Sequence, residues 1–392
     1  GLFDHPYVDV KAAKEVGSKA HEAIALDAAR KLVTLLKNQN HILPLRKDIR
    51  VAVIGPNADN VYNMLGDYTS PQPDGKVKTI LTGIRSKLPE ANVTYVKGCA
   101  VRDTAHCDIA AAVEAARQAD VVIVAVGGSS ARDFKTSYKA TGAAEADIRS
   151  VSDMDCGEGY DRATLSLLGR QQELLETLHR TGKPMVVVYI EGRPMDKSWA
   201  AGHADALLTA YYPGQEGGQA IADVLFGDVN PAGRLPISVP AHIGQLPVYY
   251  NKRAPLPHNY VEMTAKPLYA FGYGLSYTTF GYANLQIKKA GKNLFKVSLD
   301  VTNTGDRDGE EVVQLYLHDQ VASVVQPVMQ LKHFARVAIA KGETRKIEFT
   351  ITEEDLRIIN RDMQSVVEPG DFEVMVGAAS DDIRLRGMLT AE

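Results

Sequence analysis

The sequence predicts a three-layer α/β/α sandwich with a mainly parallel sheet, followed by an all-β sandwich of the immunoglobulin-like kind. Two observations carry this prediction. Between residues 51 and 226, short and continuously apolar runs alternate with stretches of helical periodicity, which is typical of a parallel sheet covered by helices on both faces. Beyond residue 280, apolar and polar residues alternate with a period of two, which indicates antiparallel strands in a sandwich.

The first predicted element is a helix over residues 10–37. This segment contains one glycine and no proline. Its apolar side chains recur at helical spacing, at Ala13, Val16, Ala20, Ala23, Ile24, Ala28, Leu32 and Leu35. Such a stripe packs against another surface. We therefore interpret the segment as a docking helix.

Alternating strands and helices are expected next. The predicted strands are the apolar runs at 51–54, 93–96, 121–126, 185–190 and 206–209, and the predicted helices cover 80–88, 108–118, 170–180 and 216–226. Residues 236–280 are rich in Pro, Tyr and Asn and form an irregular connector. Strands of the β-sandwich then follow around 295–301, 313–317, 347–351 and 372–376, separated by turn sequences such as Asn303-Thr304-Gly305.

Composition excludes several classes of protein. The chain has 392 residues, 45% of them hydrophobic, and its 44 basic against 48 acidic residues give a net charge of -4. No broad basic surface for nucleic acid is indicated, and no run of about 18 apolar residues would cross a bilayer. We therefore expect neither a nucleic-acid nor a membrane partner. The start at Gly1 has no initiator Met and no leader pattern, so we expect no targeting peptide and a chain that begins within a longer one.

No cofactor or metal site is predicted. The three cysteines, Cys99, Cys107 and Cys156, lack metal-ligand spacing. Cys99 and Cys107 either close a short loop as a disulfide or remain unpaired thiols, and the sequence leaves both readings open. The glycines at 55 and at 214–218 lack the spacing of nucleotide-binding loops.

A long polar loop follows the predicted strand at 121–126. About forty residues without regular periodicity separate Gly127 from the next helix, and such loops are usually functional. Glu158 lies between two glycines, which leave space for a ligand beside its carboxylate. Crowding by Asp155 and Asp161 would disfavour its ionised form, while Arg162 would act oppositely. From composition alone, a solvated acidic loop is the alternative interpretation.

Several motifs together resemble the C-terminal part of bacterial glycoside hydrolase family 3 β-glucosidases. They include Glu191-Gly192-Arg193-Pro194, Tyr212-Pro213-Gly214-Gln215-Glu216-Gly217-Gly218, Gly227-Asp228-Val229-Asn230-Pro231 and Phe271-Gly272-Tyr273-Gly274-Leu275-Ser276. The resemblance spans essentially the whole chain. Its last third, with Val301-Thr302-Asn303-Thr304-Gly305 and Gln330-Leu331-Lys332-His333-Phe334, resembles the fibronectin type III-like domain of that family.

The resemblance implies a retaining, two-step hydrolase of terminal β-D-glucosyl residues. The motif Gly157-Glu158-Gly159-Tyr160-Asp161-Arg162 matches the family's acid/base loop, so Glu158 is expected to be the general acid/base. The family's nucleophile is an aspartate in a Ser-Asp-Trp context on a preceding (β/α)8 barrel. Ser152-Asp153-Met154 is only a partial match, and we do not assign it. The chain alone is therefore expected to be inactive.

The implied organisation is a linker and docking helix at 1–37, the α/β sandwich domain at 38–239, a connector at 240–280 and the fibronectin type III-like domain at 281–392. The expected partners are the N-terminal barrel and a β-glucoside or oligosaccharide substrate, and the implied location is periplasmic or secreted. No substrate-binding residue is predicted. A β-xylosidase of the same family, or a non-catalytic carbohydrate-binding or scaffold module, are the alternatives.

Overall fold

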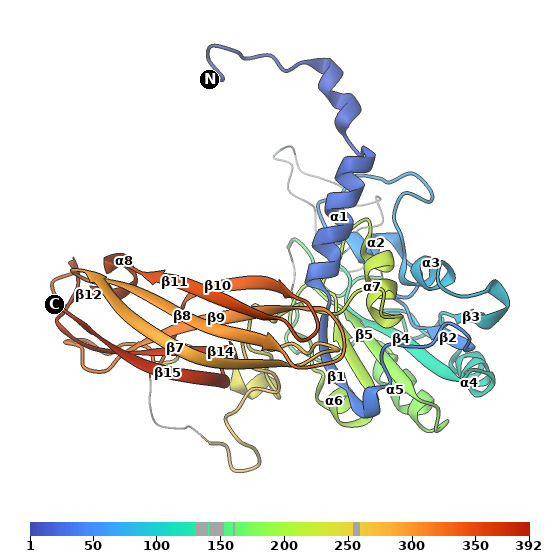
Figure 1. The fold of residues 1–392 in the computed structure, drawn as a ribbon. Coiled ribbons are helices and arrows are strands. Elements are labelled where there is room, and N and C mark those ends of the chain that lie inside the picture. Colours follow the sequence, from blue (N-terminus) through green and yellow to red (C-terminus); the bar gives the residue numbers. More distant parts are fainter. Residues whose placement is uncertain (131–139, 141–152, 160, 254–258) are drawn as a thin grey trace. The chain divides into compact units, whose positions relative to one another are not determined.

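The computed structural model describes residues 1–130, 140, 153–159, 161–253 and 259–392. The chain forms two compact units (Figure 1). One comprises Gly1–Val33, Lys37–Met195 and Ala200–Val229, and the other comprises Thr34–Leu36, Asp196–Trp199 and Asn230–Glu392. Within the described ranges, no helix combines the length and apolar character needed to cross a membrane.

The chain contains a six-stranded sheet with the strand order β1-β6-β5-β4-β2-β3, and its strands β2 to β6 lie in the first unit. The strands are β1 (Thr34–Asn38), β2 (Val51–Ile54), β3 (Val93–Val96), β4 (Val121–Gly127), β5 (Met185–Ile190) and β6 (Ala206–Thr209). β2 pairs in parallel with β3 and β4, and β5 pairs in parallel with β4 and β6. Every residue of β2, β4, β5 and β6 is buried, as their continuously apolar sequences predicted.

Helices form a layer on each side of this sheet (Figure 1). They are α1 (Lys19–Leu32), α2 (Val61–Leu65), α3 (Ile80–Arg85), α4 (Ile109–Gln118), α5 (Gln171–His179), α6 (Ser198–His203) and α7 (Gly217–Leu225). Both α1 and α3 pack against α7, and α4 packs against α5. The predicted three-layer arrangement is confirmed. After β3 the chain crosses back past β2 to form β4, so the carboxyl ends of β2 and β4 flank the point where the strand order reverses, which is where ligands bind in open α/β sheets.

The helix predicted over residues 10–37 is wrong in its extent. A short 3-10 helix (Val10–Glu15) comes first, and α1 starts only after Gly17, which has a φ of +67°. The side chain of Ser18 caps α1 by accepting a hydrogen bond from the backbone N–H of His21. Beyond Val33 the chain becomes strand β1, because its β-branched and leucine side chains are buried there. Burial overrides a periodicity that fits a helix equally well.

The second unit contains an antiparallel β-sandwich. One sheet has the order β10-β9-β14-β15 and the other β11-β8-β7. The strands are β7 (Phe280–Gly291), β8 (Leu294–Asn303), β9 (Gly309–Asp319), β10 (Gln330–Ile339), β11 (Thr344–Ile351), β14 (Gly370–Ala379) and β15 (Asp382–Ala391), with β12 (Ile358–Ile359) paired to β13 (Ser365–Val366) and a short α8 (Glu353–Leu356). Alternate residues of β8, β9 and β14, such as Val297, Leu315 and Val374, form its core. The period-two prediction is confirmed.

Candidate active site

The candidate site starts where β4 ends. Gly127 has a φ of +138°, and a Cβ there would lie 1.9 Å from the carbonyl oxygen of Ile190 on β5. The buried side-chain amide of Gln171 accepts from the N–H of Gly127 and donates to its carbonyl, each at 2.9 Å. The chain therefore leaves the sheet through a turn that only glycine permits. Part of the loop that follows, including Arg132, Asp133, Lys135, Asp147 and Arg149, lies outside the described residues.

Asp155 fixes the loop that carries Glu158 to the end of β4. Its carboxylate accepts a hydrogen bond from the backbone N–H of Ser129 at 2.8 Å, and its own N–H donates to the carbonyl of Ser129 at 2.8 Å. The side chain is 2% exposed. A Cβ on Gly128 would lie 2.4 Å from the Asp155 carboxylate, so a second glycine makes room for this anchor.

Arg162 closes the same loop seven residues later. Its guanidinium lies 3.2 Å from the carboxylate of Asp155 and is only 9% exposed. The other branch donates to the hydroxyl of Thr164 at 3.1 Å and to the carbonyl of Ser166 at 2.7 Å. A buried arginine with three acceptors holds its surroundings in one arrangement, because each lost partner leaves a desolvated polar group.

Arg193 provides a further contact, from the segment just after β5. Its guanidinium pairs with the carboxylate of Asp161, whose side chain is 81% exposed. The backbone N–H of Arg162 and the charge of Arg193 hold the pKa of Asp161 below its ordinary value. Burial and the neighbouring Asp155 raise the pKa of the Cys156 thiol, while Arg193 opposes that rise.

Glu158 is partly exposed between these contacts. An open cleft of about 460 Å³ lies beside it, lined by Cys156, Gly157, Gly159, Asp161 and Arg193. That volume falls in the range of roughly 300–1,000 Å³ expected of a small-molecule site. Asp155 and Asp161, which we expected to crowd Glu158, each pair with an arginine of their own.

Two residues of the site were missed by the sequence reasoning. Arg193 belongs to a motif that indicated only the family resemblance. Its separation from Asp161 along the sequence fits no periodic pattern that would predict their contact. The ring of Tyr212 packs close to Gly192, where a Cβ would lie 2.7 Å from the ring. Burial raises the pKa of the Tyr212 hydroxyl. Both residues follow carboxyl ends of neighbouring strands, and that shared position was the available signal.

Asp153, the partial match to a nucleophile motif, has a structural role. Its carboxylate accepts hydrogen bonds from the backbone N–H groups of Val101, Arg102 and Asp103, at 3.0, 2.8 and 3.2 Å. These bonds tie the base of the Glu158 loop to the segment that precedes α4. Ser152 lies outside the described residues.

The cysteines form no disulfide in the described parts of the chain, and tyrosines of the connector stack on other aromatic rings. Cys99 and Cys107 are free thiols, and burial raises the pKa of Cys99 to about 12. No three His, Cys, Asp or Glu side chains among the described residues gather as a metal ion would need. In the connector, Tyr250 stacks on Phe271 with ring centroids 4.1 Å apart, and Tyr269 stacks on Tyr273 at 5.2 Å.

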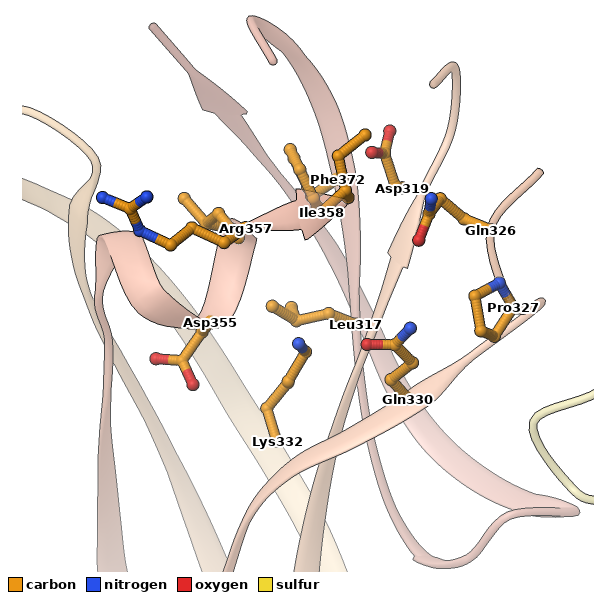
Figure 2. Close-up of a pocket in the computed structure, with 11 residues that line it drawn as sticks. Leu317, Asp319, Gln326, Pro327, Gln330, Lys332, Asp355, Arg357, Ile358 and Phe372 are labelled. Atoms are coloured by element: carbon orange, nitrogen blue, oxygen red, sulfur yellow. The ribbon is translucent and has the colours of Figure 1, made fainter. Parts of the chain in front are cut away.

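The β-sandwich contains a pocket of its own (Figure 2). It is lined by apolar side chains such as Leu317 and Phe372 and by polar ones such as Gln330 and Lys332. Burial lowers the pKa of Lys332. The volume of about 20 Å³ has room for about one water molecule and is too small for a sugar ring. This pocket gives no support to a carbohydrate-binding function for the sandwich.

The fold and the loop together define an α/β domain with a carboxylate-bearing cleft at the carboxyl edge of its sheet, followed by a β-sandwich. Residues 33–277 match the Glycosyl hydrolase family 3 C-terminal domain, and residues 311–380 match the Fibronectin type III-like domain. The chain therefore belongs to glycosyl hydrolase family 3, and the resemblance seen in its motifs is confirmed.

Similar proteins include hydrolases of two named specificities. The chain is 38% identical to a beta-xylosidase of Formosa agariphila and 35% identical to a periplasmic beta-glucosidase of Salmonella typhimurium, with 98% of this chain and 52% of each relative covered. A solved beta-glucosidase from Listeria innocua, in complex with laminaribiose, has a TM-score of 0.87 at 29% identity and covers 100% of this chain. The chain spans about half the length of the curated relatives it matches.

Proposed function

We propose that this chain supplies the general acid/base of a retaining, exo-acting β-glucosidase, and that the aspartate nucleophile lies on a (β/α)8 barrel elsewhere in the protein. The observation that carries the proposal is the partly exposed Glu158 between Gly157 and Gly159, two residues that line an open cleft. Glu158 as an acid protonates the departing glycosidic oxygen while the nucleophile attacks the anomeric carbon. As a carboxylate it then takes a proton from the water that hydrolyses the glycosyl-enzyme ester.

The experiment uses the Glu158→Ala variant of the full-length protein and a series of β-glucosides with different leaving groups. Loss of the acid should reduce kcat/KM by roughly 10²-fold or more for poor leaving groups. Activated aryl glucosides should lose little in kcat/KM, because their leaving groups depart without protonation. Steady-state rates across the series provide the check, with Glu173→Gln, in an exposed helical ion pair, as the control outside the site. Equal losses for all leaving groups would contradict the assignment.

The substrate has a second candidate. The 38% identity to the beta-xylosidase relative supports β-xylosides as the substrate as strongly as the similarity to beta-glucosidases supports β-glucosides. A panel of aryl β-glucosides and β-xylosides, compared by kcat/KM on the full-length protein, separates the two. We also propose a periplasmic or secreted location, which the name of the Salmonella relative supports.

The proposed barrel has a matching surface on this chain. The part of the predicted docking stripe that lies on α1 is largely exposed, with Ile24 68% exposed, whereas Leu35 is buried in β1. Ahead of it, Leu2, Phe3 and Tyr7 are 80–103% exposed. An apolar surface of this kind usually marks an interaction site, and we propose that the N-terminal barrel covers it.

Ile24→Asp tests this docking surface. In the isolated chain it should change the free energy of unfolding by less than about 0.5 kcal/mol, because the site is exposed. In the full-length protein it should destabilise by about 1–3 kcal/mol, because a charge is buried without a partner. Urea unfolding of both forms measures the difference. Ala29→Asp, at a position 3% exposed, should destabilise both forms, and equal small effects of Ile24→Asp in both would argue against docking.

A further inference from the structure

We propose that Asp155, Arg162 and Arg193 are positioning residues for Glu158, which hold its loop by two separate ion pairs, one within the loop beside the end of β4 and one to the segment after β5. This inference rests on the proposed function and adds to it the residues that orient the carboxylate of Glu158. None of the three residues is assigned a part in proton transfer itself.

The first ion pair, between Asp155 and Arg162, joins the two sides of the Glu158 loop and is called its neck below. Asp155 and Arg162 approach to 3.2 Å, with their side chains 2% and 9% exposed, so this ion pair joins the two sides of the segment that carries Glu158. The two backbone hydrogen bonds between Asp155 and Ser129 attach this neck to the residues that follow β4. A buried pair of this kind is costly to break, because the remaining charge would be desolvated and unpaired.

The second contact lies on the other side of Glu158. Arg193, three residues after β5 ends, pairs with the carboxylate of Asp161. Asp161 follows Glu158 by three positions along the chain. Glu158 is thus carried by a segment that is held at the neck and again at the far strand, although glycines on either side leave its own backbone free to adopt several conformations.

Such control is needed because proton transfer depends on position. A general acid must lie within about 2.6–3.2 Å of the oxygen that it protonates, and a misplacement of about 1 Å can cost 10²-fold in rate. Two flanking glycines make the peptide around Glu158 flexible, so the arginines supply the rigidity that the local sequence lacks. Their removal should therefore affect the step that requires the acid, while other steps remain.

The experiment compares Arg162→Met, Arg162→Lys, Arg193→Met and Asp155→Asn in the full-length protein, with Glu158→Ala as the reference. Each variant is assayed on the same leaving-group series, with and without azide, which attacks the glycosyl-enzyme without needing a general base. Arg170→Met with Glu173→Gln, which removes an exposed helical ion pair, is the matched control. Thermal unfolding of each variant reports stability separately.

We expect Arg162→Met and Arg193→Met to lower kcat/KM for poor leaving groups at least ten-fold and for activated ones less than three-fold, and azide to restore turnover of the activated glycosides. Arg162→Lys should recover only part of the loss, because one ammonium group does not serve the three acceptors of the guanidinium. The double variant Asp155→Asn with Arg162→Met should be no worse than Arg162→Met, because the two residues act as a unit.

Three results would overturn the inference. Losses of kcat/KM that are equal across the leaving groups would indicate general disruption of the site. A change confined to KM would indicate that the arginines bind substrate. Wild-type kinetics would show that the arginines have no positioning role. If Arg162→Met does not fold, Arg193→Met, whose side chain is 23% exposed, still decides the question. Failure of the inference is distinct from failure of the proposed function, because in the latter case Glu158→Ala itself would lack the leaving-group dependence.

Discussion

The isolated 392-residue chain will hydrolyse an aryl β-glucoside at less than about one ten-thousandth of the rate of the full-length protein. A retaining glycosidase needs two carboxyl groups about 5 Å apart, one of which forms a covalent ester with the sugar. Beside Glu158, Asp155 is buried in its ion pair with Arg162, and the exposed carboxylate of Asp161 pairs with Arg193. The proposed function places the nucleophile on the barrel, so we expect the isolated chain to lack the second reacting carboxyl group.

Release of the aryl alcohol, followed with excess purified chain over hours, measures this prediction. Glu158→Ala in the isolated chain is the control for adventitious hydrolysis, and both should match the buffer rate. Enzymes accelerate such reactions by 10⁶-fold or more, so even a weakly active chain would be detected. Turnover in the isolated chain that Glu158→Ala abolished would show that a nucleophile lies within these 392 residues, and the proposed division between domains would be wrong.

The sequence was sufficient to predict the strands of the sheet, because strands buried by helices on both faces stand out as short apolar segments. The strands at 51–54, 93–96, 185–190 and 206–209 were predicted with the bounds that they have, since each is a short run rich in apolar and β-branched residues between helices. The segment at 10–37 had two solutions, because its leucine and β-branched residues suit a buried edge strand as well as a helix. Local periodicity does not distinguish them, and the sheet that decides the matter forms from distant residues.

The candidate site was predictable only in part for the same reason. Two glycines around a carboxylate, in a long loop after a strand, are visible in the sequence and drew attention to Glu158. The partners of its neighbours come from elsewhere: Ser129 precedes Asp155 by 26 positions, and Arg193 follows Asp161 by 32. No periodicity connects such residues. They meet because parallel strands deliver their carboxyl ends to one edge of the sheet.

The second large effect is expected at Gly127, the glycine that ends β4. Gly127→Ala should lower the free energy of unfolding by roughly 3 kcal/mol or more. Its φ of +138° is closed to other residues, and the added Cβ would lie 1.9 Å from the carbonyl oxygen of Ile190. Backbone atoms cannot rotate away as a side chain can. Strands β4 and β5 would have to separate there, and the hydrogen bonds of Gln171 to Gly127 would be distorted.

Gly202→Ala is the matched control for this prediction. Gly202 lies in α6, its added Cβ would meet nothing within 4 Å, and its φ is not positive. Alanine there should stabilise the chain by about 0.5–1 kcal/mol, because it restricts the unfolded backbone and favours helix. Urea unfolding of both variants, followed by circular dichroism, gives the comparison. Equal and small effects of the two substitutions would mean that the β4 turn tolerates a side chain, and the close approach of Gly127 to β5 would then not be a constraint on the loop that carries Glu158.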